Sequence, residues 1–341
     1  MGSLEAPSRP RHRAAVAAWC AGGALLALTV ILSLLVGSNP IPPGDVIASL
    51  LGQGGAEVDY IVWAQRVPRT VAAIIVGAAL AAAGCLIQAF TRNPLADTGI
   101  LGVNAGAAFF VAVGIAFFGI VDPGAYVWLA CIGAFALTIA VSLIGSSARS
   151  GTDPIRLTLA GVALGAVFAG ATTGIALTHP DAFDRLRGWN AGSLLGRGFD
   201  VILPILPVIL VGLVLALLAA PALNSLALGA DVARSHGVDV RRSDLIVVTG
   251  TTLLAGGATA LAGPIAFVGL MVPHIARWTL GTDQRRILAG SLVLGPILVL
   301  VADIVGRVAI APSEMPAGIV TAFIGAPVLI ALVRRRKATG L

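Results

Sequence analysis

Apolar runs of about 20 residues, separated by short polar loops, recur along the whole chain. An α-helix rises 1.5 Å per residue, so a run of about 20 residues crosses the roughly 30 Å hydrocarbon layer of a membrane. The pattern therefore predicts an all-α membrane protein, a polytopic bundle of about ten transmembrane helices. The predicted spans are residues 14–36, 69–90, 98–118, 124–146, 156–177, 200–222, 244–262, 265–280, 286–308 and 317–333.

Proline and glycine interrupt several of these runs. A proline inside a helix removes a backbone hydrogen bond, which membrane helices tolerate where neighbours satisfy the freed groups. We therefore expect short kinked or broken helices, above all in the short eighth span. Glycines four residues apart predict close helix packing. The prolines are Pro94, Pro264, Pro273, Pro296 and Pro327, and the glycine pairs are Gly102 and Gly106, Gly161 and Gly165, and Gly170 and Gly174.

Composition supports a membrane protein and argues against other classes. Hydrophobic residues make up 57% of the chain and charged residues 11%, against about 45–50% and about 25% in soluble domains. The formal net charge is +6, but the basic residues lie in short loops, which favours membrane orientation over nucleic-acid binding. Cys20, Cys85 and Cys131 lie inside apolar runs without metal-binding spacing, so we expect packing roles and no disulfide framework.

The loop charges also orient the predicted bundle. Ten spans place both termini on one side, and sixteen of the 22 Lys and Arg residues then fall on that side. An excess of positive charge in short loops marks the cytoplasmic side. We therefore predict a cytoplasmic tail over residues 1–13, a membrane domain over 14–333 and a basic cytoplasmic tail over 334–341.

The chain lacks the residues of the common nucleotide-binding and catalytic motifs. Lys337, in the basic tail, is the only lysine, so a phosphate-binding loop is excluded and ATP can act only through a partner. The four histidines are scattered without a metal-binding pair, and no Ser, His and Asp set stands out. We therefore expect no enzymatic site, no metal site and no cofactor in this chain.

Asp303 is the acidic residue that the span pattern places deepest in the membrane. Proton-coupled transporters usually carry such a buried carboxylate. Arg307 follows one helical turn later, a spacing that favours an i,i+4 ion pair. We prefer the structural pair over a proton relay.

Three arginines lie at the predicted outer ends of two spans. Arg66 and Arg69, in "QRVPRT", precede the second span, and Arg307 ends the ninth. They could anchor helices to lipid phosphates, or they could bind carboxylates of a soluble partner, because guanidinium groups match carboxylates in a bidentate way. The residues alone favour neither role.

The stretch "LALGADVARSHGVDVRRSD", residues 226–244, is a long polar interruption between the sixth and seventh spans. Leu228, Val232 and His236 recur at i, i+4 and i+8, which predicts one narrow helical face. Asp231 suits a first turn, and Gly237 can end the helix in a left-handed conformation. "VDVRRSD" then predicts a second short turn or helix. An amphipathic connector lying on the membrane surface is the alternative.

Four stretches resemble the FecCD family, the permease subunits of ATP-binding-cassette (ABC) importers for iron-siderophores, haem and cobalamin. They are "RVPRTVAAIIVGAALAAAGCLIQAFTRNPLADTGILGVNAGA", "GWNAGSL", "GPIAFVGLMVPHIAR" and "PAGIVTAFIGAPVLIALVRRR". They occur in the family's order, and the resemblance runs from about Arg66 to Arg336. Ten helices, predicted above from spacing and charge, is also the number that the family has.

The resemblance implies partners and site residues. It implies a second permease subunit, identical or homologous, two ATPase subunits that bind ATP and Mg on the inner side, and a substrate-binding protein outside. Arg66, Arg69 and Arg307 match positions that receive glutamates of that binding protein; Arg185, Arg187 and Arg197 are further candidates without this support. The ATPase contact implied is residues 226–244, with Leu228, Gly229, Asp231, Val232, Arg234, His236, Gly237 and Val238.

One departure from the family affects the gate. Where the cobalamin permease has small hydroxyl residues before the fifth span, this chain has "TDPIR", so we assign no gate to Thr152, Pro154 or Ile155. The resemblance predicts a permease domain over 14–333 in the bacterial inner membrane that moves a ferric siderophore, or a related chelate such as haem or cobalamin, and is not an enzyme. The alternative, a secondary transporter driven by an ion gradient, needs intramembrane charges that are nearly missing.

Overall fold

A computed structural model describes residues 9–120, 122–147, 151–152 and 154–338. Within that part of the chain, seven helices are long and apolar enough to cross a membrane, and two shorter apolar helices cover Val103–Phe118 and Ala317–Ala331. The all-α prediction is therefore confirmed. The outermost residues of both predicted tails, 1–8 and 339–341, lie outside the described residues.

Ten principal helices follow the ten predicted spans in order. Their bounds are α1 Arg9–Leu35, α4 Val67–Thr91, α5 Val103–Phe118, α6 Pro123–Gly145, α7 Pro154–Thr178, α9 Phe199–Leu226, α11 Val240–Ala262, α12 Val268–Leu280, α13 Gln284–Ala309 and α14 Ala317–Ala338. Most extend past the predicted ends, and in α1, α11, α13 and α14 the added residues include charged ones, which end the apolar run without ending the helix.

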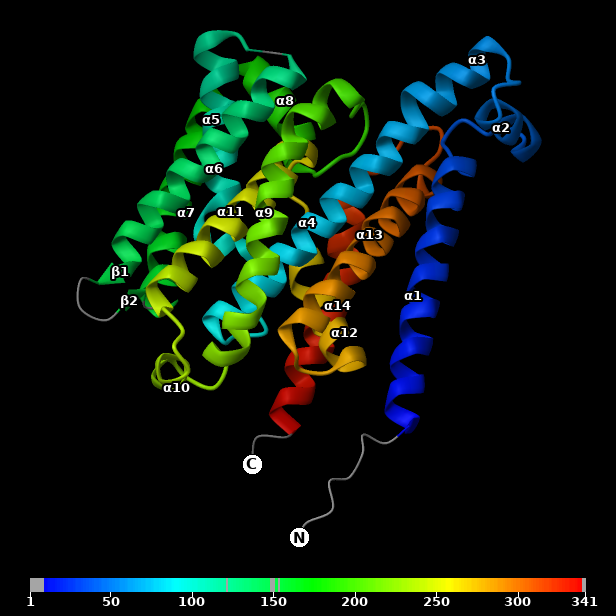
Figure 1. Ribbon diagram of the computed structural model, residues 1–341. Coiled ribbons are helices and arrows are strands. Elements are labelled where there is room, and N and C mark those ends of the chain that lie inside the picture. The colour runs from blue at the N-terminus through cyan, green and yellow to red at the C-terminus, as the bar shows by residue number, and fades with distance from the viewer. Residues whose placement is uncertain (1–8, 121, 148–150, 153, 339–341) are drawn as a thin grey trace.

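Short elements lie at the two ends of the bundle. Figure 1 shows α2, α3 and α8 at one end, here the upper end, and α10 with the two strands at the other, the lower end. The first turn of α1 and the last turn of α14 both lie at the lower end, as an even number of crossings requires. The short elements are α2 Pro43–Leu50, α3 Ala56–Asp59, η1 Tyr60–Arg66, η2 Thr98–Leu101, α8 Pro180–Asn190, α10 Ala230–Ser235, and the antiparallel pair β1 Ser146–Ser147 and β2 Gly151–Thr152.

Helix α4 lies at the centre of the bundle and packs against α9, α11, α12 and α13. Glycines allow its backbone to approach two neighbours. A Cβ atom on Gly77 would lie 2.5 Å from the carbonyl oxygen of Gly295 in α13, and one on Gly84 would overlap the backbone of Gly269 in α12. Small residues drive association in lipid, where van der Waals packing replaces the hydrophobic effect.

The glycine pairs predicted as packing seams behave differently from one another. Gly106 meets the backbone of Gly133 in α6, and Gly161 meets the carbonyl of Ile100, so these two positions form seams. Gly170 and Gly174 of α7 are exposed, and a Cβ on either would meet nothing within 4 Å. The third prediction is therefore wrong within this chain, because α7 turns that face outward.

The break between α11 and α12 matches the expected interruption in the eighth span. Gly263 has φ +75°, Phe267 has φ +69°, and the residues between them are not helical. Helix α12 has 13 residues, about 20 Å at 1.5 Å per residue, too short to cross roughly 30 Å of hydrocarbon. The segment around Pro264 thus enters the bundle and reaches a cavity there.

Candidate functional site

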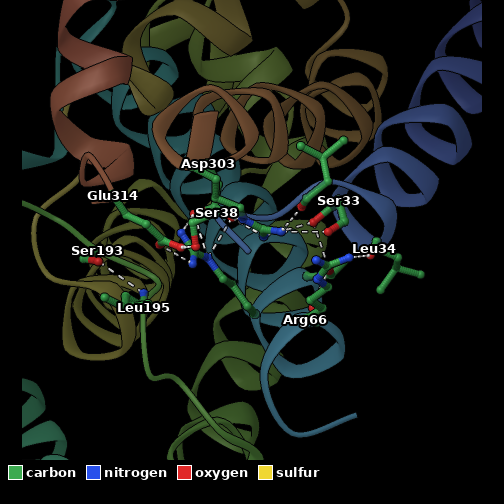
Figure 2. Close-up of polar contacts among 12 residues, drawn as sticks. Ser33, Leu34, Ser38, Arg66, Ser193, Leu195, Asp303 and Glu314 are labelled. Atoms are coloured by element: carbon green, nitrogen blue, oxygen red, sulfur yellow. Dashed lines mark hydrogen bonds and ion pairs between the residues drawn. The ribbon is translucent and has the colours of Figure 1, made fainter. Parts of the chain in front are cut away.

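A network of buried charges joins α4 and α13 at the upper end. Asp303, 1% exposed, accepts from Arg69 through Nε at 3.0 Å and Nη2 at 2.7 Å. It also accepts from Arg307, through Nε at 3.0 Å and through Nη2. Figure 2 shows Asp303 with its acceptor oxygens turned into this network. One carboxylate therefore bridges two guanidinium groups whose residues lie 238 positions apart in the chain.

Two arginines cap the C-terminal end of α1. The last four carbonyl groups of a helix have no partner within it, and cations there also interact favourably with the helix dipole. Arg66 and Arg307 supply the missing donors, and Figure 2 shows Arg66 directed at α1. The acceptors are the carbonyl oxygens of Ser33, Leu34, Leu35, Val36 and Asn39, at 2.7–3.0 Å.

Glu314 completes the network from the loop between α13 and α14. Its Oε2 accepts from Arg69 Nη1 at 2.6 Å, and its Oε1 accepts from Ser38 Oγ at 2.6 Å. Burial acts to raise the pKa of Glu314, but the Ser38 hydrogen bond and the charge of Arg69 outweigh it and hold the pKa below its usual value. Glu314 is therefore a charged ligand of Arg69 supplied by the chain itself.

The three arginines predicted for docking are brought together, but they are neither exposed nor free. Arg66, Arg69 and Arg307 are 5%, 9% and 1% exposed, and each bonds acceptors of this chain. The predicted pair of Asp303 and Arg307 is confirmed. Sequence reasoning missed the bond from Arg69 to Asp303, and the one available signal was the isolation of a single acid within an apolar span.

The predicted coupling region, residues 226–244, lies at the lower end. Helix α10 has six residues, with Asp231 in its first turn, paired to Arg234 at 2.7 Å. Gly229 with φ +114° precedes the helix and Gly237 with φ +78° follows it, so the predicted left-handed end is confirmed. A Cβ on either glycine would meet nothing within 4 Å, so backbone conformation and not space requires glycine there.

Two details of the predicted region are wrong. The first helix starts after Leu228 rather than including it, because Gly229 takes a positive φ. "VDVRRSD" forms no separate second helix, because α11 begins at Val240 and continues into the membrane. The side chain of Asp239 caps that helix by accepting from the amide of Arg242 at 3.0 Å.

The apolar face predicted for this region points outward. Leu228 is 66% exposed and Val232 is 40% exposed, and His236 is exposed beside them. Ala233, on the opposite side of α10, is fully buried, and Val238 packs against the core. The region thus presents apolar side chains outward at the lower end of the molecule.

A reciprocal pair of hydrogen bonds fixes the end of α9 just before this region. Asn224 Nδ2 donates to Asp283 Oδ1 at 2.9 Å, and Asn224 Oδ1 accepts from the amide of Gln284 at 2.8 Å. The hydrogen bonds from Asn224 and from the amide of Arg285 lower the pKa of Asp283. The C-terminal end of α9 is therefore attached to the N-terminal turn of α13.

A cavity of about 680 Å³ opens on one face of the chain. Its wall includes α14 from Gly318 to Pro327, and the broken segment at Pro264. Asp97 and Asn104 bring polar groups into this mostly apolar lining. Within the residues described, no three His, Cys, Asp or Glu side chains gather in a way that would hold a metal ion. Sequence reasoning did not identify this lining.

Helices long enough to cross a membrane and a lateral cavity among them are the features of a polytopic membrane transport protein. The chain belongs to the FecCD transport family, whose profile matches residues 25–335. It is 47% identical over 316 residues to the ferric enterobactin transport system permease protein FepD of Escherichia coli strain K12, covering 93% of this chain and 94% of that protein.

Other relatives agree with this assignment. The hemin transport system permease protein HmuU of Yersinia pestis is 36% identical, covering 92% of this chain and 95% of that protein. A solved structure described as a metal-chelate type ABC transporter in an inward-facing conformation superposes with a TM-score of 0.81 at 26% identity, covering 94% of this chain and 99% of that one. The family and the fold are thus shown over nearly the whole chain.

Proposed function

We propose that this chain is the permease subunit of an ABC importer in the bacterial inner membrane, and that it carries no catalytic site. The observation that carries the proposal is the family match across residues 25–335, on a chain with one lysine and no phosphate-binding loop. Transport by alternating access then takes its energy from ATP and Mg bound by two partner ATPase subunits.

The cargo we propose is a ferric siderophore or a related metal chelate such as haem or cobalamin. Support comes from relatives named for ferric enterobactin, siderophores and hemin. The lining of the cavity is mostly apolar, which suits brief contact with a large chelate more than tight retention. Selectivity would then reside largely in the substrate-binding protein that delivers the cargo.

A second permease subunit, identical or homologous, would cover the face formed by α7 and α14. Only 17% of the most apolar stretch of α7 is buried within this chain. Gly170 and Gly174 are exposed on its surface. Such spacing of small residues is typical of helix contacts in membranes. Phe323 of α14 is 73% exposed at the rim of the cavity. The cavity would then be one half of a central path.

The ATPase contact we propose is α10 with its flanking glycines. Exposed Leu228 and Val232 support it, as does the clustering of basic loops at the lower end. With that end in the cytoplasm, both tails lie there and the upper end faces outward. Docking by Arg66, Arg69 and Arg307 stays a prediction, and it requires a carboxylate of the binding protein to compete with Glu314 or Asp303.

No observation favours the secondary transporter. Such a carrier needs an intramembrane carboxylate that gains and loses a proton or binds an ion. Asp303, the buried acid of α13, is engaged in ion pairs with both Arg69 and Arg307, so it is not free to bind a transported ion.

Reconstitution tests the proposed function. In proteoliposomes that hold this chain with its cognate ATPases and binding protein, we expect uptake of ferric chelate that requires ATP inside and stops with vanadate. Liposomes with this chain alone serve as the control. Uptake by the chain alone, driven by a proton gradient, would establish the secondary transporter instead.

A second measurement tests coupling through α10. Gly237→Ala places a side chain at φ +78°, a strain of roughly 1 kcal/mol, so we expect ATP hydrolysis to persist while uptake per ATP falls severalfold. Gly119→Ala is the matched control, because Gly119 has φ +63° and open space around it and lies at the other end of the bundle. Equal uptake by the two variants would show that α10 is only a connector.

A further inference from the structure

We propose that Arg197 forms a carboxylate-binding site at the upper end, which receives an acidic side chain of the extracytoplasmic binding protein. This site rests on the proposed function, because it presupposes that such a protein docks there. Arg197 lies in the loop between α8 and α9. Its guanidinium would form an ion pair with a carboxylate that the docked protein inserts between two adjoining cavities.

Arg197 is buried and has no ionic partner in the part of the chain that the structure describes. Its residue is 8% exposed, and its Nε is a buried donor with no hydrogen-bond partner among the described residues. Within the described residues, its side chain donates one hydrogen bond, from Nη1 to the hydroxyl of Tyr126 at 3.2 Å, and the guanidinium carbon lies 5.9 Å from the centre of the Tyr126 ring. Arginine has five N–H donors in a fork that fits a carboxylate, so most of its capacity is unused.

Arg197 differs from the three buried arginines near it in its hydrogen bonds. Arg66, Arg69 and Arg307 each donate two or more hydrogen bonds to carbonyl or carboxylate oxygens of this chain. A buried charge without a counter-ion is costly, and a ligand that supplies the counter-ion removes that cost. An incoming carboxylate therefore gains most at Arg197, where it displaces no hydrogen bond to a carbonyl or carboxylate oxygen of the described structure.

Two cavities lead to this side chain. One, of about 400 Å³, also contacts Arg66, Arg69 and Arg307, and the other, of about 540 Å³, contacts Arg185. Both are lined by Leu195, Gly196, Arg197 and Glu314, and Figure 2 shows Leu195 on the Glu314 side of the charged network. Arg197 thus lies at the junction of two spaces that open at the upper end.

The two carboxylates that line the cavities beside Arg197 form no ion pair with it in the described structure. Glu314 is held by Arg69 and Ser38, both at 2.6 Å. Asp200 lines the smaller cavity but is exposed, in the first turn of α9, and makes no ion pair with Arg197 in the described structure. Four arginines and these two carboxylates line the smaller cavity, and Asp303 supplies a third negative charge to Arg69 and Arg307. One positive charge is thus left without a counter-ion. The excess of positive charge favours binding of an anionic group.

The occupant is a protein side chain rather than the chelate itself. At 8% exposure, Arg197 can be reached only by a slender group, and an acidic side chain carries its charge at the tip of a flexible stem. A bulky chelate would have to bring a charged oxygen past Leu195 and Gly196, which line both approaches.

The test measures the affinity of the binding protein for the whole transporter in lipid nanodiscs. We expect Arg197→Met to raise the Kd by about 10- to 100-fold, the usual worth of a charge-assisted hydrogen bond. Salt should weaken docking less in this variant than in the wild type. Arg187→Met is the matched control, because Arg187 is an exposed arginine of α8 that lines neither cavity. We expect the Kd of the binding protein for this variant to change by less than about threefold.

Folding is controlled in the same preparations. Replacing an unpaired buried charge by an apolar side chain of similar size should leave the Tm of the free transporter unchanged or raise it. Tyr126→Phe keeps the charge and removes the hydroxyl that orients it, so its Kd should rise less than that of Arg197→Met. A properly folded Arg197→Met transporter that binds with wild-type affinity and salt dependence would overturn the site.

Two further outcomes separate this inference from the proposed function. If the wild-type assembly shows no ATP-driven uptake, the proposed function fails. If the wild type transports and Arg197→Met lowers uptake without changing the Kd, the arginine contacts the cargo and docking at Arg197 is overturned, while the transport function stands.

Discussion

Asp303→Asn should lower the free energy of unfolding by about 3–5 kcal/mol, the largest stability loss that we expect from a single substitution in this chain. The amide keeps the shape of the carboxylate but removes its charge, and Arg69 and Arg307 then lie buried with one carboxylate, Glu314, between them. Thermal unfolding of the purified protein in detergent measures the effect.

Two variants calibrate that loss. Asp231→Asn breaks an ion pair whose side chains are 98% and 54% exposed, so we expect a change of at most about 0.5 kcal/mol. Glu314→Gln, at a partly buried site with one arginine, should fall between the two. Unfolding of Asp303→Asn at the same temperature as Asp231→Asn would show that the two buried arginines do not depend on Asp303.

Gly84→Val should disrupt the packing of α4 on α12. A Cβ atom at Gly84 would overlap the backbone of Gly269. A side chain could relieve such an overlap by changing rotamer, whereas backbone can do so only if the helix shifts. Gln88 also holds α12 in place, because its Nε2 donates to the carbonyls of Gly269 and Leu270 at 3.1 Å. Overpacking of this kind costs about 1–3 kcal/mol and more where backbone is displaced, which thermal unfolding and protease sensitivity would detect.

Gly23→Val is the matched control for Gly84. Gly23 lies within a membrane helix, α1, and a Cβ there would meet nothing within 4 Å. We expect a change of less than about 1 kcal/mol, mainly from the helix propensity of valine. Comparable losses at both positions would mean that helix propensity, and not contact with α12, determines the effect at Gly84.

The order and number of the membrane helices could be predicted from the sequence, because hydrocarbon thickness sets the length of each apolar run. Helix ends were less predictable. The seventh span is predicted over 244–262, yet α11 begins at Val240 and includes Arg241 and Arg242 in its first turn. A charged residue ends the part of a helix that lies in lipid, whereas a cap or a breaker ends the helix itself.

In the candidate sites, too, some features could be predicted from the sequence and others could not. The left-handed turn at Gly237 could be predicted because it depends on local backbone conformation. The burial of Arg66, Arg69 and Arg307 could not, because their acceptors come from the end of α1, from α13 and from the loop before α14. Arg197 carried no signal beyond its charge, and only the structure distinguishes it from Arg187.

The capping of α1 has a consequence for sequence variation. Arg66 and Arg307 bind main-chain carbonyls at the end of this helix, and every amino acid has such a carbonyl. The side chains of Leu34, Leu35 and Val36 can therefore be replaced without loss of these hydrogen bonds, provided that the helix still ends at the same residue. Mutational drift in the peripheral first helix is thus compatible with an unchanged attachment to the bundle, whereas the two arginines themselves have no such latitude.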